Sequence, residues 1–354
     1  MKKLPKSVVL TVCVVLLAVF ALLFEALRFG GVFTRVASHF AGACRAVELG
    51  GSAEDVQIDR ERGVAYLSLL DRDMINRGEA VSGTIMLMDL KLPEPAPRAA
   101  MAFEPADFRP HGLSLLRRAG QPLRLFAISH ADARRHVVEI AEQDANGGFF
   151  PKATISDATF THPNALVAVG PAQFYLVNDR PVQTGWQRSW SALLRSGNAS
   201  LVYYDGTGAR VLVDDLAYPA GLAMSPDGTQ LYVGEALAKA LRVYRVLAPG
   251  KLELERTVEL GTAPDNLNVD ADGVIWIAAH PKLLRFVGHA RDASKRAPTQ
   301  VLRYDPRRAD AAAEVVYVDD GSTLSAGTVA AHWRGEFLVG ALLDKKVLIC
   351  KPDP

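Results

Sequence analysis

Only three cysteines occur in this 354-residue sequence, and none belongs to a Cys-x-x-Cys pair of the kind that redox and zinc sites use. The sequence also lacks the Gly-x-Ser-x-Gly elbow of serine hydrolases and a glycine-rich phosphate-binding loop. Its 40 basic and 39 acidic residues leave a formal net charge of +1, and no basic run stands out. Nothing therefore favours a nucleic-acid partner. Helical periodicity is scarce after residue 45, which favours the all-β class.

One long hydrophobic run lies at the N-terminus. Lys2, Lys3 and Lys6 precede an apolar stretch over residues 8–24. A positively charged start followed by a segment near the minimum membrane span is typical of a signal peptide or a retained anchor. No small-x-small cleavage site follows directly, so we expect residues 1–40 to be a signal anchor and linker. The lysines would then lie on the cytoplasmic side and the rest of the chain outside the cytoplasm. The alternative is a buried helix of a soluble protein.

Two of the cysteines, Cys44 and Cys350, bracket nearly the whole remaining chain. In an exported protein such a pair can form a disulfide, which here would close a loop of more than 300 residues. The alternative is two unpaired thiols. The third cysteine, Cys13, lies inside the apolar run.

Residues 41–354 read as six similar units of short strands. The units begin near residues 51, 108, 162, 219, 262 and 327, and turns rich in Gly, Asp, Pro and Asn separate their strands. In the fifth unit, Asp270-Ala-Asp272-Gly273 predicts a hairpin turn before a strand over residues 274–277. Units of roughly 40–60 residues with three or four strands predict a six-bladed β-propeller. The first strand of each blade would line the central channel.

Polar residues recur where these first strands begin. They are Glu54 and Asp55, His111, Asn164, and Asp265 with Asn266. Because the first strands of a propeller share one axis, their carboxylate and amide oxygens are expected to converge there. Burying such a cluster without a cation is costly, and Ca²⁺ prefers hard oxygen ligands. The pattern therefore predicts a calcium site in the tunnel. The alternative is that these residues only form turns.

These motifs resemble those of the paraoxonase/arylesterase family, and more distantly those of gluconolactonase-like and strictosidine-synthase-like propellers. The matching stretches are Gly51-Ser-Ala-Glu54-Asp55, Arg109-Pro-His111-Gly112, Ser129-His130, Asn164 with the following Val-Ala-Val-Gly170-Pro, Ser225-Pro-Asp-Gly228, Asp265-Asn266 and Ala279-His280-Pro281. The likeness covers nearly the whole chain, including the N-terminal hydrophobic segment and the pair Cys44 and Cys350.

The resemblance implies a propeller with two calcium ions in its tunnel, one catalytic and one structural. By position, the catalytic calcium would be held by Glu54, Asn164, Asp265 and Asn266. The structural calcium would be held by Asp55 and by the backbone carbonyl of Leu113. One side-chain ligand of each site is replaced, an Asn by Ala220 and an Asp by Ala165. We therefore expect the catalytic site to bind calcium more weakly than in the family, and the second site to keep one carboxylate.

The resemblance also implies hydrolysis of lactones and aryl esters. His111 would act as general base on a water molecule, and His130 would relay the proton or orient His111. Either histidine could instead be structural. The resemblance gives His280 a place near the pocket wall and no chemistry. Trp186 and Trp190, in an insertion of the third unit, could contact a membrane, cap the pocket or simply pack. The rival function is a non-catalytic propeller, a scaffold or binding protein whose calcium is structural.

Overall fold

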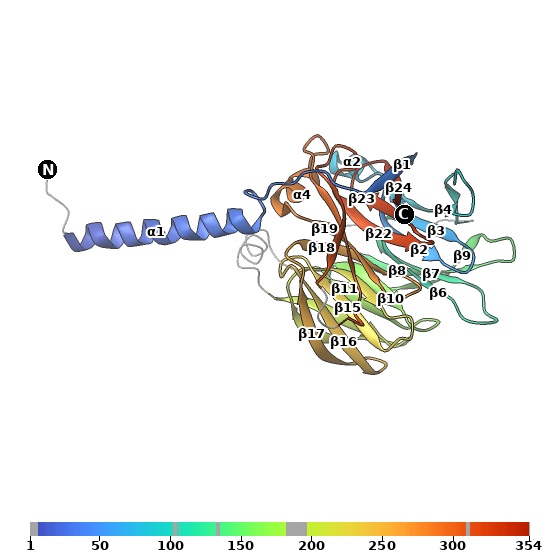
Figure 1. The fold of residues 1–354 in the computed structure, drawn as a ribbon. Coiled ribbons are helices and arrows are strands. Elements are labelled where there is room, and N and C mark those ends of the chain that lie inside the picture. The colour runs from blue at the N-terminus through green and yellow to red at the C-terminus, as the bar shows by residue number, and fades with distance from the viewer. Residues whose placement is uncertain are drawn as a thin grey trace.

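The protein is a six-bladed β-propeller with an apolar N-terminal helix, as the sequence predicts (Figure 1). The computed structural model describes residues 6–101, 105, 107–131, 135–181, 197–308 and 312–353. Lys2 and Lys3 of the predicted anchor, and Trp186 and Trp190 of the third unit, lie outside the described residues. Each blade is an antiparallel sheet of four strands, and the six innermost strands contact one another in cyclic order around the axis.

Strand order runs from the axis outward in every blade. The innermost strands are β2 (Ser52–Asp59), β6 (Pro110–Leu116), β10 (Pro163–Ala168), β14 (Pro219–Met224), β18 (Ala263–Val269) and β22 (Gly327–Trp333). The second strands are β3 (Val64–Leu70), β7 (Arg124–His130), β11 (Phe174–Asn178), β15 (Gln230–Glu235), β19 (Ile275–His280) and β23 (Glu336–Ala341). The third strands are β4 (Thr84–Asp89), β8 (His136–Gln143), β12 (Ala199–Tyr204), β16 (Ala240–Ala248), β20 (Thr299–Tyr304) and β24 (Lys346–Pro352). The outer strands are β5 (Arg98–Ala99), β9 (Phe149–Ile155), β13 (Ala209–Leu216), β17 (Lys251–Glu259), β21 (Glu314–Asp319) and β1 (Gly42–Glu48).

The hydrophobic core lies between neighbouring blades. Alternating strand residues give each sheet two apolar faces, and each face packs against the next blade. Between the sixth and first blades, for example, Val329 and Leu338 pack against Val56 and Leu67. Each such fully buried side chain contributes roughly 1.5–3 kcal/mol of transfer free energy. The ring of interfaces holds the six inner strands in fixed positions around the axis.

The first strand of the propeller closes the ring. β1 pairs antiparallel with β24 as the outer strand of the sixth blade, with Cys44 opposite Cys350. A disulfide joins these two cysteines, which confirms the predicted pair. The closure removes an open sheet edge, and it is anchored further by Phe40, which packs edge-on against Tyr317 and Phe337.

Every innermost strand is interrupted by a β-bulge near its start. The register shifts lie between Ala53 and Val56, Pro110 and Leu113, Pro163 and Ala165, Pro219 and Gly221, Pro264 and Leu267, and Gly327 and Val329. A bulge adds residues on one strand and turns their side chains away from the regular alternation. The six bulges thus repeat one backbone irregularity at the same level of the propeller.

Helix α1 (Lys6–Phe29) projects away from the propeller as a single rod (Figure 1). Its segment Ser7–Phe29 has a mean hydropathy of 3.0 and is long and apolar enough to cross a membrane. The end of α1 is held on the propeller, where Lys239 Nζ donates a hydrogen bond to the Phe29 carbonyl at 2.8 Å. Two short helices, α2 (Arg72–Asn76) and α4 (Leu283–His289), follow the second strands β3 and β19. They therefore lie at the end of the propeller where the inner strands begin.

Candidate functional site

The residues expected at the strand starts fall within the bulges. Glu54 and Asp55 lie in the bulge of β2, His111 in that of β6 and Asn164 in that of β10. The equivalent position of β18 holds Asp265 and Asn266. The sixth position holds Thr328, which the sequence pattern did not suggest. The bulges explain how two consecutive residues of one strand, such as Asp265 and Asn266, can both belong to the tunnel.

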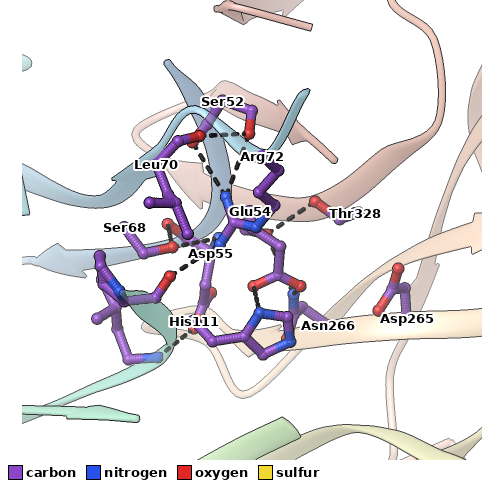
Figure 2. A network of polar contacts seen from close by, with 12 residues as sticks. Ser52, Glu54, Asp55, Ser68, Leu70, Arg72, His111, Asp265, Asn266 and Thr328 are labelled. Atoms are coloured by element: carbon purple, nitrogen blue, oxygen red, sulfur yellow. Dashed lines mark hydrogen bonds and ion pairs between the residues drawn. The ribbon is translucent and has the colours of Figure 1, made fainter. Parts of the chain in front are cut away.

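Glu54 accepts hydrogen bonds from residues of the fifth and sixth blades (Figure 2). Asn266 Nδ2 donates to Glu54 Oε1 at 2.9 Å and to the Glu54 carbonyl at 3.1 Å. Thr328 Oγ1 donates to the same carbonyl at 2.8 Å. On the neighbouring strand β6, His111 Nδ1 lies 3.6 Å from Glu54 Oε2. Residues more than 200 positions apart in the sequence therefore meet at one carboxylate, as predicted from the repeat.

The charge of Glu54 is costly in this position. Its side chain is 3% exposed, and burial together with the nearby Asp265 and Asp55 carboxylates raises the pKa of Glu54. The Arg72 guanidinium opposes this rise. Arg72 begins α2 and is fixed there by hydrogen bonds from Nη2 to the Pro110 carbonyl at 2.8 Å and from Nη1 to Ser52. A raised carboxylate pKa at a buried site indicates a place where a cation would be stabilised.

Among the described residues, two buried oxygen acceptors of the expected ligand set have no hydrogen-bond partner. They are Glu54 Oε2 and Asn164 Oδ1, and the Asn164 residue is 8% exposed. Unsatisfied buried acceptors are rare because each costs the desolvation of a polar group. A hard cation would satisfy both, so these residues fit a calcium ion. Within the described part of the chain, no group of three or more His, Cys, Asp or Glu side chains is gathered closely enough to hold a metal. The fit to calcium therefore depends on the amide side chains as well as on the carboxylates. The amides are Asn164 and Asn266, and the carboxylates are Glu54 and Asp265.

Asp265 is oriented by a histidine on the neighbouring strand. His280 Nε2 donates a hydrogen bond to Asp265 Oδ2 at 2.7 Å, and both residues are buried. The His280 ring stacks on Phe286 of α4, with ring centroids 3.7 Å apart. These contacts fix the Asp265 carboxylate, and they give His280 a positioning contact that the sequence did not predict.

The residues expected for a second, structural calcium are arranged differently. The two oxygens of Asp55 accept hydrogen bonds from the Leu113 N–H at 2.6 Å and the Val56 N–H at 2.7 Å. Leu113 thus reaches Asp55 through its N–H group. Burial raises the pKa of Asp55 to about 6 against these backbone hydrogen bonds. Ala165 is buried in an apolar cluster of the third and fourth blades. The Asp55 carboxylate is already satisfied by the protein, so a second calcium site stays a prediction.

The bulge of the fourth blade carries no ligand side chain. Ala220 packs with Ala236 and Ala263 in a small apolar cluster, against which Tyr218 and Leu283 lie. Just after it, a Cβ atom on Gly221 would stand 2.3 Å from the Asp265 carbonyl. The missing side chain at Gly221 therefore lets β14 approach β18 closely, and the fourth blade contributes close packing at this level.

A cluster of four histidines lies beside the proposed ligands. His111 and His130 have ring centroids 5.0 Å apart, and His130 Nδ1 lies 2.8 Å from His136 Nδ1. The fourth ring, His162, stacks on His130 at 5.2 Å. Burial and the positive groups around it, with Arg72 foremost, hold the pKa of His111 well below its usual range. Burial and the other histidines do the same for the pKa of His130. These surroundings favour the neutral form of both rings.

The histidines line a cavity of about 610 Å³ at the end of the propeller where the inner strands begin. One part of its wall is apolar, with Leu70, Ile75, Leu342 and Leu343. This volume is typical of a small-molecule site. The cavity, the histidines and the unsatisfied acceptors lie at the same end of the propeller.

The sequence of this chain is similar to those of known proteins. The model of the arylesterase family matches residues 51–351. The chain belongs to the arylesterase family. Serum paraoxonase/arylesterase 1 of Rattus norvegicus is 30% identical over 269 residues, which cover 74% of this chain and 75% of the relative. Serum paraoxonase/arylesterase 1 of Homo sapiens is 28% identical over 275 residues, covering 76% and 77%.

Solved structures show the same fold for this arylesterase-family chain. A luciferin-regenerating enzyme aligns with a TM-score of 0.54 at 13% identity, covering 88% of this chain and 95% of that one. Regucalcin of Agrobacterium tumefaciens, described as a calcium-binding protein, aligns with a TM-score of 0.51 at 16% identity, covering 89% and 95%. At these identities the likeness establishes the propeller fold alone.

Several polar residues of the candidate site were missed from the sequence. His136 lies directly opposite His130 in the β7–β8 register, and His162 stands two residues before Asn164. His162 Nδ1 lies 3.0 Å from Asp179 Oδ1, and Arg180 donates to His162 Nε2. Their position in the sequence could have indicated them, because they flank strand ends that the repeat places at the same end of the propeller as the expected ligands.

Proposed function

We propose that this protein is a membrane-anchored, calcium-dependent hydrolase of carboxylic esters, with lactones and aryl esters as substrates. The observation that carries the proposal is the pair of unsatisfied buried acceptors, Glu54 Oε2 and Asn164 Oδ1, beside His111 at a cavity of about 610 Å³. Family membership supports ester hydrolysis as the reaction class.

One calcium ion would be held by Glu54, Asn164, Asp265 and Asn266. When bound there, it would supply a Lewis acid for the ester carbonyl and for the charge that develops on its oxygen. With Ala220 in the fourth blade, fewer protein oxygens surround the ion, so weaker binding than in family members with an Asn there is expected. A second calcium at Asp55 is a weaker proposal, because that carboxylate already accepts two backbone N–H groups.

The histidines would move the proton. His111 Nδ1 faces Glu54 Oε2, which leaves Nε2 to accept a proton from the attacking water. A neutral ring is the form that can do so, and the lowered pKa of His111 keeps it neutral. His130, hydrogen-bonded to His136, would pass the proton on or hold the His111 ring. The water oxygen bonds to the acyl carbon, the ester C–O bond breaks, and the leaving alkoxide or phenoxide takes up a proton. Oxygen leaving groups need less protonation than amines do, and the proton that His111 takes from the water is available for transfer to the leaving oxygen.

The location of the enzyme is part of the proposal. α1 would cross the membrane, with the lysines at its start on the cytoplasmic side. The propeller would then lie on the extracytoplasmic face, periplasmic or extracellular. The disulfide between Cys44 and Cys350 supports an oxidising compartment for the propeller.

Hydrolysis assays on the purified full chain test the function. Phenyl acetate and a medium-chain lactone would be assayed with calcium and with chelator, for the wild type, His111→Gln and the exposed control His39→Gln. We expect chelation and His111→Gln each to reduce kcat/KM by at least about 100-fold, and the control to have no effect. Activity that survives chelation would contradict the calcium mechanism. No turnover of either ester while calcium still binds would favour the scaffold alternative.

A further inference from the structure

Among the described residues, the charged side chains that line the cavity are all positive. Among the described residues that line it are three arginines, Arg72, Arg109 and Arg180, and no aspartate or glutamate. Two of these arginines lie near a buried carboxylate behind the wall. Arg72 interacts with Glu54, and Arg180 Nη1 lies 3.5 Å from Asp179 Oδ2. Their charges are thus partly balanced within the protein.

Arg109 is the arginine without such a partner. Its Nε donates one hydrogen bond, to the Val81 carbonyl at 3.3 Å, and in the described part of the chain no carboxylate lies within ion-pair distance of it. Its backbone is fixed, because its N–H donates to Ser129 Oγ at 3.0 Å. Arg109 stands two residues before His111, is half-buried, and lines the same cavity as the histidines. An uncompensated cation in a partly desolvated wall attracts an anion more strongly than one in open solvent.

Another part of the cavity wall is apolar, which further limits the kind of ligand that the cavity can bind. Leu70, Ile75, Leu342 and Leu343 offer an aliphatic surface in the same cavity. A ligand that fills the cavity should therefore combine a hydrocarbon part with an anionic group. A carboxylate suits the planar fork of an arginine guanidinium, which can bind its two oxygens together.

On this basis, and resting on the proposed function, we propose that the substrate is an ester or lactone that carries a carboxylate on its acyl chain, and that Arg109 binds this carboxylate. Arg180 lines the same wall and adds positive potential. Arg109 is then a specificity-determining residue, and it takes no part in breaking the ester bond. Neutral esters would still be hydrolysed, with a higher KM.

A matched pair of esters tests the proposal. Phenyl hexanoate and monophenyl adipate differ only in whether a methyl or a carboxylate ends the six-carbon acyl chain. Arg109→Gln should lower kcat/KM for monophenyl adipate about tenfold, chiefly through KM, and leave phenyl hexanoate within about twofold. Raising the ionic strength should reduce turnover of monophenyl adipate alone.

Arg118→Gln is the control variant. Arg118 lies just past the other end of β6, outside the cavity lining, and likewise donates a side-chain hydrogen bond to a backbone carbonyl, that of Val169 at 3.0 Å. The Arg118→Gln variant should have the same kcat/KM as the wild type for both esters. Equal effects of Arg109→Gln on the two esters, or no effect on either, would overturn the proposal.

A binding measurement separates this proposal from the proposed function. If the wild type hydrolyses neither ester, the hydrolase assignment fails, and titration calorimetry with hexanoate then decides the binding role of Arg109. Hexanoate binding that weakens about tenfold in Arg109→Gln, and is unchanged in Arg118→Gln, supports carboxylate recognition. Hexanoate binding that is absent, or equal in wild type and Arg109→Gln, overturns it.

Discussion

His280 donates a hydrogen bond of 2.7 Å to the carboxylate of Asp265, and this links the second strand of the fifth blade to a proposed calcium ligand on the first. Residues that hydrogen-bond to a metal ligand hold it in orientation, and their mutation commonly lowers metal affinity 10- to 100-fold. We expect His280→Ala to weaken calcium binding by roughly that factor, because Asp265 loses its fixed orientation. Calcium titration by calorimetry measures the change.

The conservative variant His280→Gln can still donate a hydrogen bond and should recover part of the affinity. His39→Ala, in an exposed position far from the tunnel, is the control and should bind calcium as the wild type does. Unchanged affinity in His280→Ala would show that Asp265 does not need this contact or does not bind calcium.

Removal of the disulfide should lower stability strongly. The bond joins residues 306 positions apart, and chain-entropy models give a loop of this length roughly 5–6 kcal/mol. We expect Cys44→Ser with Cys350→Ser to unfold at a clearly lower temperature than the wild type, and a reductant to lower the wild-type Tm in the same way. Cys13→Ser, in the exposed part of α1, is the control. If the double variant melted as the wild type does, the β1–β24 pairing alone would suffice to close the ring.

Asp270 should make the fold sensitive to acid. Burial alone would raise its pKa, but the interaction with His332 and the hydrogen bonds from Trp276 Nε1 and the Val274 N–H outweigh burial and lower the pKa to about 2. A depressed pKa contributes stability that is present above about pH 4 and is lost as the pH falls toward 2. The contribution is roughly 1–2 kcal/mol.

Urea unfolding between pH 7 and pH 2 measures this contribution. Asp270→Asn should be less stable than the wild type at pH 7, and the difference should shrink toward pH 2. The exposed Asp214→Asn serves as control. A difference between wild type and Asp270→Asn that stayed constant over this range would mean that the carboxylate charge adds no stability.

Deletion of α1 should release the protein from membranes without unfolding it. The side chains of the helix are mostly exposed, and its end is held by the bond between Lys239 and the Phe29 carbonyl. We expect a variant in which a cleavable signal peptide replaces residues 1–29, so that the propeller is still exported and its disulfide still forms, to keep a Tm within a few degrees of the wild type. It should move from the membrane fraction to the soluble fraction on centrifugation. Retention of that variant on membranes would show that the propeller itself binds lipid.

The number of blades could be read from the sequence because turn residues and short strands repeat at regular spacing. The hairpin at Gly273 is one example, since its positive φ of 79° is a conformation that glycine adopts readily. β18 ends at Val269 and β19 begins at Ile275, as the turn signal indicates. The meeting of Glu54 with Asn266 also followed from the repeat, because equivalent strand starts share one axis.

The details of the site could not be predicted in the same way. The bulges depend on how six inner strands adjust to one another, and a bulge decides which of two neighbouring side chains faces the tunnel. Gly112 shows the coupling, since a Cβ atom there would lie 2.4 Å from the Asn164 carbonyl of the next blade. The contact of Arg72 with Glu54 depends on a short helix that follows a different strand. Such positions follow from tertiary packing and have no local pattern.

The pairing of β1 with β24 also has a consequence for biosynthesis. β1 is made before the other strands of the sixth sheet, and β24 is made after the strands of the other five blades, so β1 waits with an unpaired edge while those blades emerge. The ring cannot close, and Cys44 cannot meet its partner thiol, until β24 has left the ribosome. A premature stop codon at Lys346 would therefore leave five blades made and the circle open.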